Sequence, residues 1–133
     1  DNASDTVIKA LSQTVTDKNG QWLLQAHADA HNELALTLYE NDQFKQFIID
    51  RTFIDDDGTR WIIDYKTGSH LGGDLQQFLD NEKLRYQAQL HNYARLMNKI
   101  DQRPTKLALY FPLMQQMLSW VYPASAMREN EII

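Results

Sequence analysis

The sequence predicts an α/β (α+β) fold, in which a mixed β-sheet of about five strands is flanked by helices. Five short segments alternate apolar with polar residues or are rich in β-branched and aromatic residues, which is typical of strands. A short and a long segment instead carry apolar residues at helical spacing. The long one separates the first three strands from the last two, which predicts one crossover connection in the sheet.

The expected order is helix, three strands, helix and two strands. The first helix is expected at 6–15, with Ser4 or Asp5 as its cap. A turn is expected at 17–20, and irregular or weakly helical chain at 26–32. The remaining elements are strands at 33–39, 44–54, 59–66, 106–111 and 117–122, a glycine-rich loop at 68–73, a long helix at 79–100 and a tail at 128–133.

Length and composition narrow the class of protein. The chain has 133 residues, of which 43% are hydrophobic, so it suits one domain with a real core. No segment has the length of a membrane span, and the N-terminus does not resemble a signal peptide. The net charge of -5 argues against a free-standing nucleic-acid binder but is compatible with a carboxylate metal site. The absence of cysteine excludes disulfides, thiol catalysis, Cys-based zinc sites and iron–sulfur clusters.

The turn between the second and third strands sets the pairing of two acidic residues. A three-residue loop that ends at Gly58 suits the left-handed conformation that glycine adopts easily. Asp55 then pairs with Thr59. Counting on along both strands places Asp50 directly opposite Asp64, so both side chains share one face.

A two-residue loop would lead to a different arrangement. Asp50 would then face Tyr65, and the two acids would lie on opposite faces. The position of the glycine favours the three-residue loop. With that loop, Lys66 joins the acids, because it lies two residues beyond Asp64 on the same strand.

Two carboxylates that face each other across a sheet repel, so the pattern indicates a compensating cation. Oxygen ligands suit Mg2+. Beside them, Lys66 would stabilise charge on a phosphate, or orient and deprotonate an attacking water. A strand that ends in Asp-Tyr-Lys also fits a strand reaching solvent, with a surface ion pair worth about 0–1 kcal/mol. The presence of Asp50 on the same face favours the metal site.

Two polar residues on the long helix are further candidates. Gln89 and Tyr93 are four residues apart and share a helix face, where they would hold a phosphate or fix the lysine. A tyrosine on an amphipathic helix is more often part of the core, and that alternative stays open. His91 is turned away from Gln89 and is expected to face solvent or a neighbouring loop, so we do not assign it as a ligand.

Three motifs in this order resemble a known family. They are Asp-Arg at 50–51, Asp-Tyr-Lys-Thr-Gly at 64–68 and Gln-Leu-His-Asn-Tyr at 89–93. Together they resemble the PD-(D/E)XK nucleases of the RecB type. More specifically, they resemble the C-terminal nuclease domain of bacterial UvrD-like helicase–nucleases, such as the exonuclease V beta subunit. A Trp-Leu-Leu patch at 22–24 that leads to Glu33 also fits this family. The resemblance covers residues 20–122.

The resemblance implies a restriction-endonuclease-like core and a role for each matching residue. Asp50, Asp64 and the backbone carbonyl of Tyr65 would bind the metal, which would be Mg2+ with Mn2+ as an alternative. The other roles implied are catalytic lysine for Lys66, support of the metal or its water for Glu33, and completion of the site and DNA contact for Gln89 and Tyr93.

The sequence departs from the family in two places. The family has a glycine shortly before the first acid, where this chain has Phe-Ile-Ile at 47–49. The family also has a metal-ligating histidine on an N-terminal helix. His27 and His31 come too late in the order for that role. The resemblance therefore implies that 1–133 is a single nuclease domain, a C-terminal fragment of a longer helicase–nuclease that lacks the N-terminal helix, and that the fragment alone could be inactive.

The expected function is a metal-dependent DNA nuclease, an exonuclease of recombination and repair. By the resemblance, its partners would be DNA, helicase domains of the same polypeptide and other helicase–nuclease subunits. ATP would serve the attached helicase region only, no membrane is involved, and the location would be the bacterial cytoplasm, associated with DNA. One alternative is a catalytically silent nuclease-like domain that binds DNA or a partner subunit. Another is a plain interaction module with solvated acids.

Overall fold

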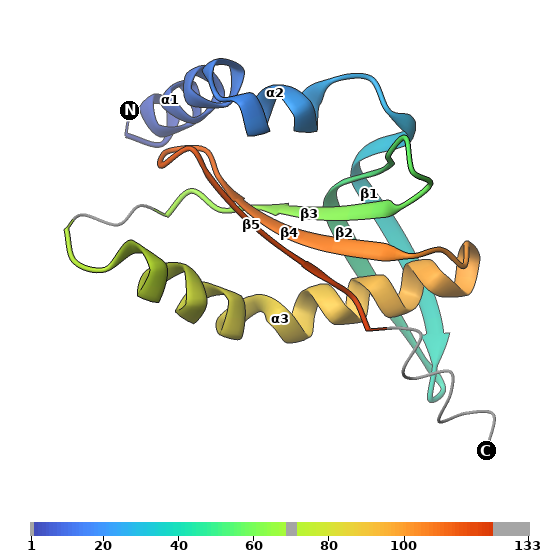
Figure 1. Cartoon of the computed structure of the whole chain (residues 1–133). Coiled ribbons are helices and arrows are strands. Elements are labelled where there is room, and N and C mark those ends of the chain that lie inside the picture. Colours follow the sequence, from blue (N-terminus) through green and yellow to red (C-terminus); the bar gives the residue numbers. More distant parts are fainter. Residues whose placement is uncertain (1, 69–71, 124–133) are drawn as a thin grey trace.

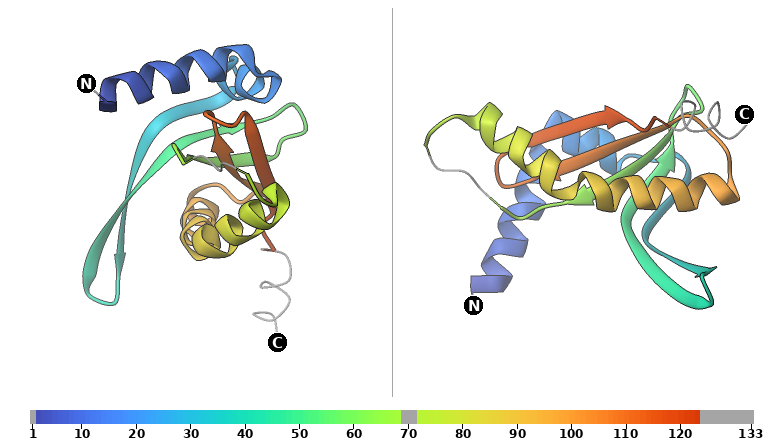
Figure 2. Two further views of the ribbon diagram at one scale, coloured as in Figure 1. Left: turned by 90° about the vertical axis from the view of Figure 1, so that its left-hand side faces the viewer. Right: turned by 90° about the horizontal axis from the view of Figure 1, so that it is seen from below.

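The computed structural model describes residues 2–68 and 72–123 and contains a five-stranded mixed sheet with helices on both faces (Figures 1 and 2). This confirms the predicted fold class. Helices α1 and α2 lie on one face of the sheet, and α3 lies on the other. The elements in order are α1 (Asn2–Thr16), α2 (Lys18–Leu24), β1 (Ala28–Glu40), β2 (Gln43–Ile54), β3 (Arg60–Tyr65), α3 (Leu75–Ile100), β4 (Thr105–Phe111) and β5 (Gln116–Val121).

The strands lie in sequence order across the sheet, from β1 at one edge to β5 at the other. Strands β1, β2 and β3 form an antiparallel meander. Strand β3 then pairs with β4 in parallel, and β4 with β5 antiparallel. The helix α3 connects the two parallel strands, so the predicted crossover is confirmed.

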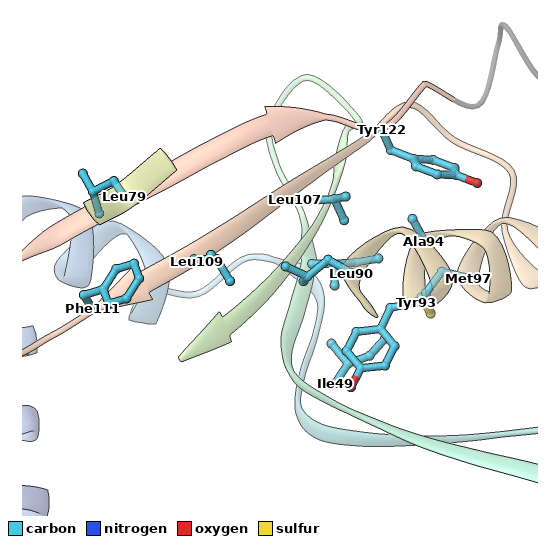
Figure 3. Close-up of a cluster of buried hydrophobic side chains, with 11 residues drawn as sticks. Ile49, Leu79, Leu90, Tyr93, Ala94, Met97, Leu107, Leu109, Phe111 and Tyr122 are labelled. Atoms are coloured by element: carbon cyan, nitrogen blue, oxygen red, sulfur yellow. The ribbon is translucent and has the colours of Figure 1, made fainter. Parts of the chain in front are cut away.

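Two apolar clusters hold the layers together. The larger lies between the sheet and α3 (Figure 3), and its buried members are Ile49, Ile62, Leu79, Leu90, Tyr93, Ala94, Met97, Leu107, Leu109, Phe111 and Tyr122. The smaller lies on the α2 side and consists of Leu23, Phe53, Trp61, Ile63, Ala108 and Tyr110. The neighbours Ile62 and Ile63 belong to opposite clusters, because successive side chains of a strand alternate between faces. The next residue, Asp64, therefore takes the α3 face.

The N-terminal helices differ from the prediction. Helix α1 begins at Asn2, so Ser4 and Asp5 lie inside the helix rather than capping it. The segment predicted as a turn at 17–20 instead forms the N-cap and the first residues of α2. The side chain of Asp17 accepts a hydrogen bond from the backbone N of Gly20 at 3.3 Å. Asp, Asn and Gly suit turns and helix N-termini alike, which is why the pattern was misread.

Strand β1 starts five residues before the predicted 33, within the segment expected to be irregular. Long-range contacts hold this early part. Arg51 Nη1 donates to Asn32 Oδ1 at 2.9 Å, and Arg60 Nη2 donates to Asp29 Oδ2 at 2.6 Å. The register shifts between Ala28 and His31, so no simple alternation marks the strand in the sequence.

The remaining boundaries are close to the prediction. Strands β2 to β5 begin and end within one residue of the expected positions. Helix α3 begins four residues earlier, at Leu75, because Asp74 caps it by accepting from Gln77 N at 3.2 Å. The glycine-rich loop lies partly, and the tail at 128–133 wholly, outside the described residues. Within the described part of the chain, no helix is both long and apolar enough to cross a membrane.

Candidate active site

The hairpin between β2 and β3 has the predicted three-residue loop. Gly58 adopts a left-handed conformation with φ of 79°, which suits the last loop position. The backbone N of Asp55 donates to Thr59 O at 2.9 Å. The ladder continues to the pair Arg51 and Ile63, so the predicted register is confirmed.

The same register places Asp50 across from Asp64, where the two strands end their ladder. The backbone N of Tyr65 donates to Asp50 Oδ2 at 2.8 Å. This bond uses a side-chain oxygen where a regular ladder would use a carbonyl, and it fixes the carboxyl of Asp50 over the end of β3. The side chain of Asp64 is only 12% exposed.

The electrostatics of Asp50 reflect this crowding. Burial, followed by a side-chain hydrogen bond with Asp64 and the negative charge of that carboxyl, raises the pKa of Asp50 to about 6. The bond from Tyr65 N and the charge of Lys66 act in the opposite direction. The fold therefore holds two carboxyls closer together than their charges favour, and a bound cation would relieve the repulsion.

Lys66 completes this cluster. Its Nζ lies 2.6 Å from Asp64 Oδ2 and 3.5 Å from the centre of the Tyr86 ring. Its backbone N donates to Tyr110 O at 2.8 Å, which continues the β3–β4 pairing one residue past the strand. The structure thus brings together three of the predicted site residues, Asp50, Asp64 and Lys66.

Tyr65, whose backbone carbonyl was predicted as a ligand, is the last residue of β3 and directly follows Asp64. Its peptide N bonds Asp50, and its side chain packs against the smaller apolar cluster on the α2 side. Burial raises the pKa of its phenol. The ligand role of the carbonyl stays a prediction.

Gln89 and Tyr93 share a face of α3 as predicted. Gln89 Nε2 donates to Tyr93 Oη at 2.7 Å. The ring of Tyr93 is buried in the larger cluster and packs edge-on against Phe47 at 6.0 Å between ring centres. Tyr93 is therefore a core residue whose hydroxyl bonds Gln89. The residue of α3 that contacts Lys66 is Tyr86, which lies three residues before Gln89.

The expectation for His91 was wrong. Its Nε2 accepts a hydrogen bond from Trp120 Nε1 at 3.0 Å, and its ring packs edge-on against Tyr122. The expectation failed because the last strand and the residue after it cover this side of α3. Burial lowers the pKa of His91.

Glu33 lies in the same row of the sheet as the two aspartates, on the strand next to that of Asp50. Its neighbours Asn32 and Leu34 pair with Arg51 and Ile49, so the register places Glu33 across from Asp50. Glu33 is exposed and has a left-handed φ of 50°. Among the residues that the structure describes, no group of three or more His, Asp or Glu side chains is arranged to hold a metal ion.

At Glu33, which has the left-handed φ, the regular alternation of side chains between the two sheet faces is interrupted in the β1–β2 hairpin. On one side of this row, Arg51 reaches toward α2, where its Nε donates to Leu23 O at 2.6 Å. On the other side, Leu34 and Ile49 pack into the cluster against α3. At the row of Asp50, the side chains of the β1–β2 hairpin therefore change from the α2 face of the sheet to the α3 face.

Sequence reasoning missed the structural roles of Arg51 and Tyr86. Arg51 is 5% exposed and bonds the carbonyls of Leu23 and Gln25 at the end of α2. A cation suits this end of a helix. Its position next to Asp50, between the apolar residues Ile49 and Phe53, was a signal. For Tyr86, the signal was its spacing of three and seven residues from Gln89 and Tyr93.

The carboxylate pair fits a divalent metal ion. Mg2+ is commonly bound by one or two carboxylates, together with waters and substrate phosphates. Asp64 Oδ2 is buried and accepts no hydrogen bond of good geometry within 2–68 and 72–123, although Lys66 lies within ion-pair distance. That oxygen and the carboxyl of Asp50 are suitable ligands at the edge of the larger cluster.

Of three comparisons with known proteins, one identifies a family. No curated protein matches the sequence significantly. A solved structure titled "Crystal structure of SSO0001" is similar with a TM-score of 0.41 and 15% sequence identity, over 92% of this chain and 58% of that chain. The chain thus spans somewhat more than half the length of that solved structure's chain. The family model described as PD-(D/E)XK nuclease superfamily matches residues 6–130. Since this match covers nearly the whole sequence, the chain belongs to the PD-(D/E)XK nuclease superfamily.

Proposed function

We propose that the protein is a metal-dependent nuclease that hydrolyses phosphodiester bonds of DNA. The observation that carries this proposal is the cluster of Asp50, Asp64 and Lys66 at the point where the pairing of β2 with β3 ends. The family consists in general of metal-dependent nucleases, and the donor set suits Mg2+, with Mn2+ as an alternative.

The residues of the chain divide the work of hydrolysis between them. Asp50 and Asp64, with the carbonyl of Tyr65, would hold the ion, which when bound polarises the scissile phosphate and lowers the pKa of a water. Lys66 donates hydrogen bonds to the oxygens on which negative charge develops. Its side chain is 20% exposed and its ammonium lies beside Asp64.

Three further residues belong to the proposed site. Glu33, across from Asp50 in the sheet, would support the ion or its water. Gln89 and Tyr93 form a hydrogen-bonded pair on the same helix face as Tyr86. That pair would complete the wall of the site and contact DNA.

We also propose a RecB-type context, in which this nuclease domain acts on DNA ends supplied by an attached helicase. Three motifs in the order and spacing of that type support it. In this arrangement the domain is an exonuclease of repair and recombination, ATP is used by the helicase region only, and the partners are DNA, the helicase domains and other subunits. The net charge of -5 fits a domain whose DNA channel lies partly on neighbouring domains.

A second candidate function is a catalytically silent nuclease-like domain that binds DNA or a partner subunit. One observation favours it: within the described residues the acidic cluster contains two carboxylates rather than three or more. Such a domain would not need the lysine beside them, so we rank it second.

A cleavage experiment separates these functions. A linear duplex and a covalently closed circle of the same sequence are incubated with Mg2+ or Mn2+ and with wild type, Asp64→Ala or Asp56→Ala. Asp56 is an exposed acid of the adjacent loop and serves as the matched control. We expect degradation of the linear DNA only, a loss of about 100-fold or more in Asp64→Ala, and wild-type activity in Asp56→Ala. Equal activity of the Asp64 variant contradicts the nuclease site, and cleavage of the circle contradicts exonuclease action.

A further inference from the structure

Lys66 is held from two sides by groups of different chemistry. On one side its Nζ lies 2.6 Å from Asp64 Oδ2. On the other side it lies 3.5 Å from the centre of the Tyr86 ring, well within the 6 Å range of a cation–π contact. The first partner is also a proposed metal ligand, and the second is not.

The ring of Tyr86 is itself fixed. Tyr86 is partly buried and packs against the larger apolar cluster. It lies four and seven residues before Leu90 and Tyr93, which are buried members of that cluster on the same helix face. Within the described residues, two cations lie over this ring: Lys66 Nζ at 3.5 Å from its centre and Arg85 Cζ at 5.1 Å, so Lys66 is the nearer of the two.

The two contacts respond differently when Asp64 is engaged by a divalent ion. The negative charge of Asp64 is then shared with the ion, and the attraction between this carboxylate and Lys66 weakens. The attraction of the aromatic face for the ammonium does not depend on that charge. We propose that Tyr86 is a positioning residue, which keeps the ammonium of Lys66 beside the Asp50 and Asp64 carboxyls when a metal ion occupies Asp64. The catalytic part of this inference rests on the nuclease function proposed above.

The test compares variants that keep or remove the aromatic face. Tyr86→Phe keeps the ring, Tyr86→Leu removes it, and Tyr39→Leu removes a tyrosine from the tip of the β1–β2 hairpin as the matched control. We expect Tyr86→Leu to lower kcat on linear DNA by about 3- to 30-fold, while KM and Mg2+ affinity stay within about twofold. Tyr86→Phe and Tyr39→Leu should keep wild-type kcat.

A second set of variants keeps the shape of the side chain. Fluorine atoms added stepwise to the ring in a Tyr86→Phe series weaken the negative potential of its face without removing packing. We expect kcat to fall with each added fluorine. A kcat that is independent of fluorination overturns the proposal, as does a Tyr86→Phe variant that loses as much activity as Tyr86→Leu.

A spectroscopic measurement tests the contact without reference to activity. In the wild-type chain, the Hε protons of Lys66 should show an upfield ring-current shift in NMR spectra, both without and with saturating Mg2+. The shift should persist in Tyr86→Phe and vanish in Tyr86→Leu. Loss of the shift on addition of Mg2+, or its persistence in Tyr86→Leu, overturns the proposal. If the wild type binds Mg2+ but cleaves no DNA, the proposed function fails, and this measurement alone decides the role of Tyr86.

Discussion

The pKa of Asp50 makes the stability of the protein depend on pH. Its pKa is raised from the usual 3.8 to about 6, first by burial and then by Asp64. The bond from Tyr65 N keeps the carboxyl in place in spite of this. A carboxyl whose pKa is higher in the folded than in the unfolded chain binds more protons when folded. Ionisation of Asp50 therefore lowers the stability of the fold as the pH rises from the unfolded pKa of 3.8 through the folded pKa of about 6, and the loss persists at higher pH.

The first prediction concerns Asp50→Asn without metal. Asparagine keeps an oxygen for Tyr65 N but carries no charge, so the variant should be more stable than wild type at pH 8. Solvent screening of this half-buried group limits the gain to about 1 kcal/mol. The gain should disappear at about pH 3, where the wild-type residue is largely protonated in both the folded and the unfolded chain. Thermal unfolding in EDTA at the two pH values measures it, and a variant less stable than wild type at pH 8 contradicts this account.

A second prediction at this scale concerns Lys66→Met. The ammonium is 2.6 Å from Asp64 Oδ2 and competes with a metal ion for that oxygen. The variant should lose DNA cleavage yet bind Mn2+ at least as tightly as wild type, because a nearby positive charge has been removed. Calorimetric titration with Mn2+ and a cleavage assay are the measurements. Weaker Mn2+ binding would show that the lysine supports the metal site rather than competing with it.

At the scale of elements, the predictability of the chain depends on how local the determining contacts are. The register of β2 and β3 could be predicted because Gly58 fixes a short loop between them. The start of β1 could not, since it depends on Arg51 and Arg60, which are 19 and 31 residues away from their partners Asn32 and Asp29. The start of α2 was misread because residues 17–20 also suit a turn, and the contacts that require Gly20 there, with Thr14 O and Tyr110 Oη, cannot be read from those four residues.

Those contacts lead to the third prediction, for Gly20→Ala. A Cβ atom at position 20 would lie 2.2 Å from Thr14 O and 2.8 Å from Tyr110 Oη. Tyr110 Oη also donates to Asp17 Oδ2 at 2.7 Å, so the methyl group would disturb the junction of α1, α2 and the sheet. We expect a loss of about 1–3 kcal/mol in the free energy of unfolding by urea. Gly68→Ala is the matched control, since nothing lies within 4 Å of its Cβ position. Equal stability of both variants would argue against close packing at this junction.

At the scale of the whole molecule, strand order and the α3 crossover bring residues 50, 64 and 66 together next to α3. This much of the site could be predicted, because the motif order and one hairpin determine it. The exposed position of Glu33 could not, since nothing in the sequence indicates a left-handed φ at a glutamate in a strand. The spacing of Tyr86 indicates its helix face, but its contact with Lys66 could not be predicted, because that contact depends on the position of α3 along the sheet.

The central claim is that β2 and β3 hold a divalent metal ion through Asp50 and Asp64, at the point where their pairing ends. Calorimetric titration of Mn2+ into wild type, Asp64→Ala and the loop control Asp56→Ala tests it most directly. The account predicts saturable binding to wild type and to the Asp56 variant, and none to the Asp64 variant. Saturable binding that persists unchanged in Asp64→Ala, or no binding to wild type, would contradict it.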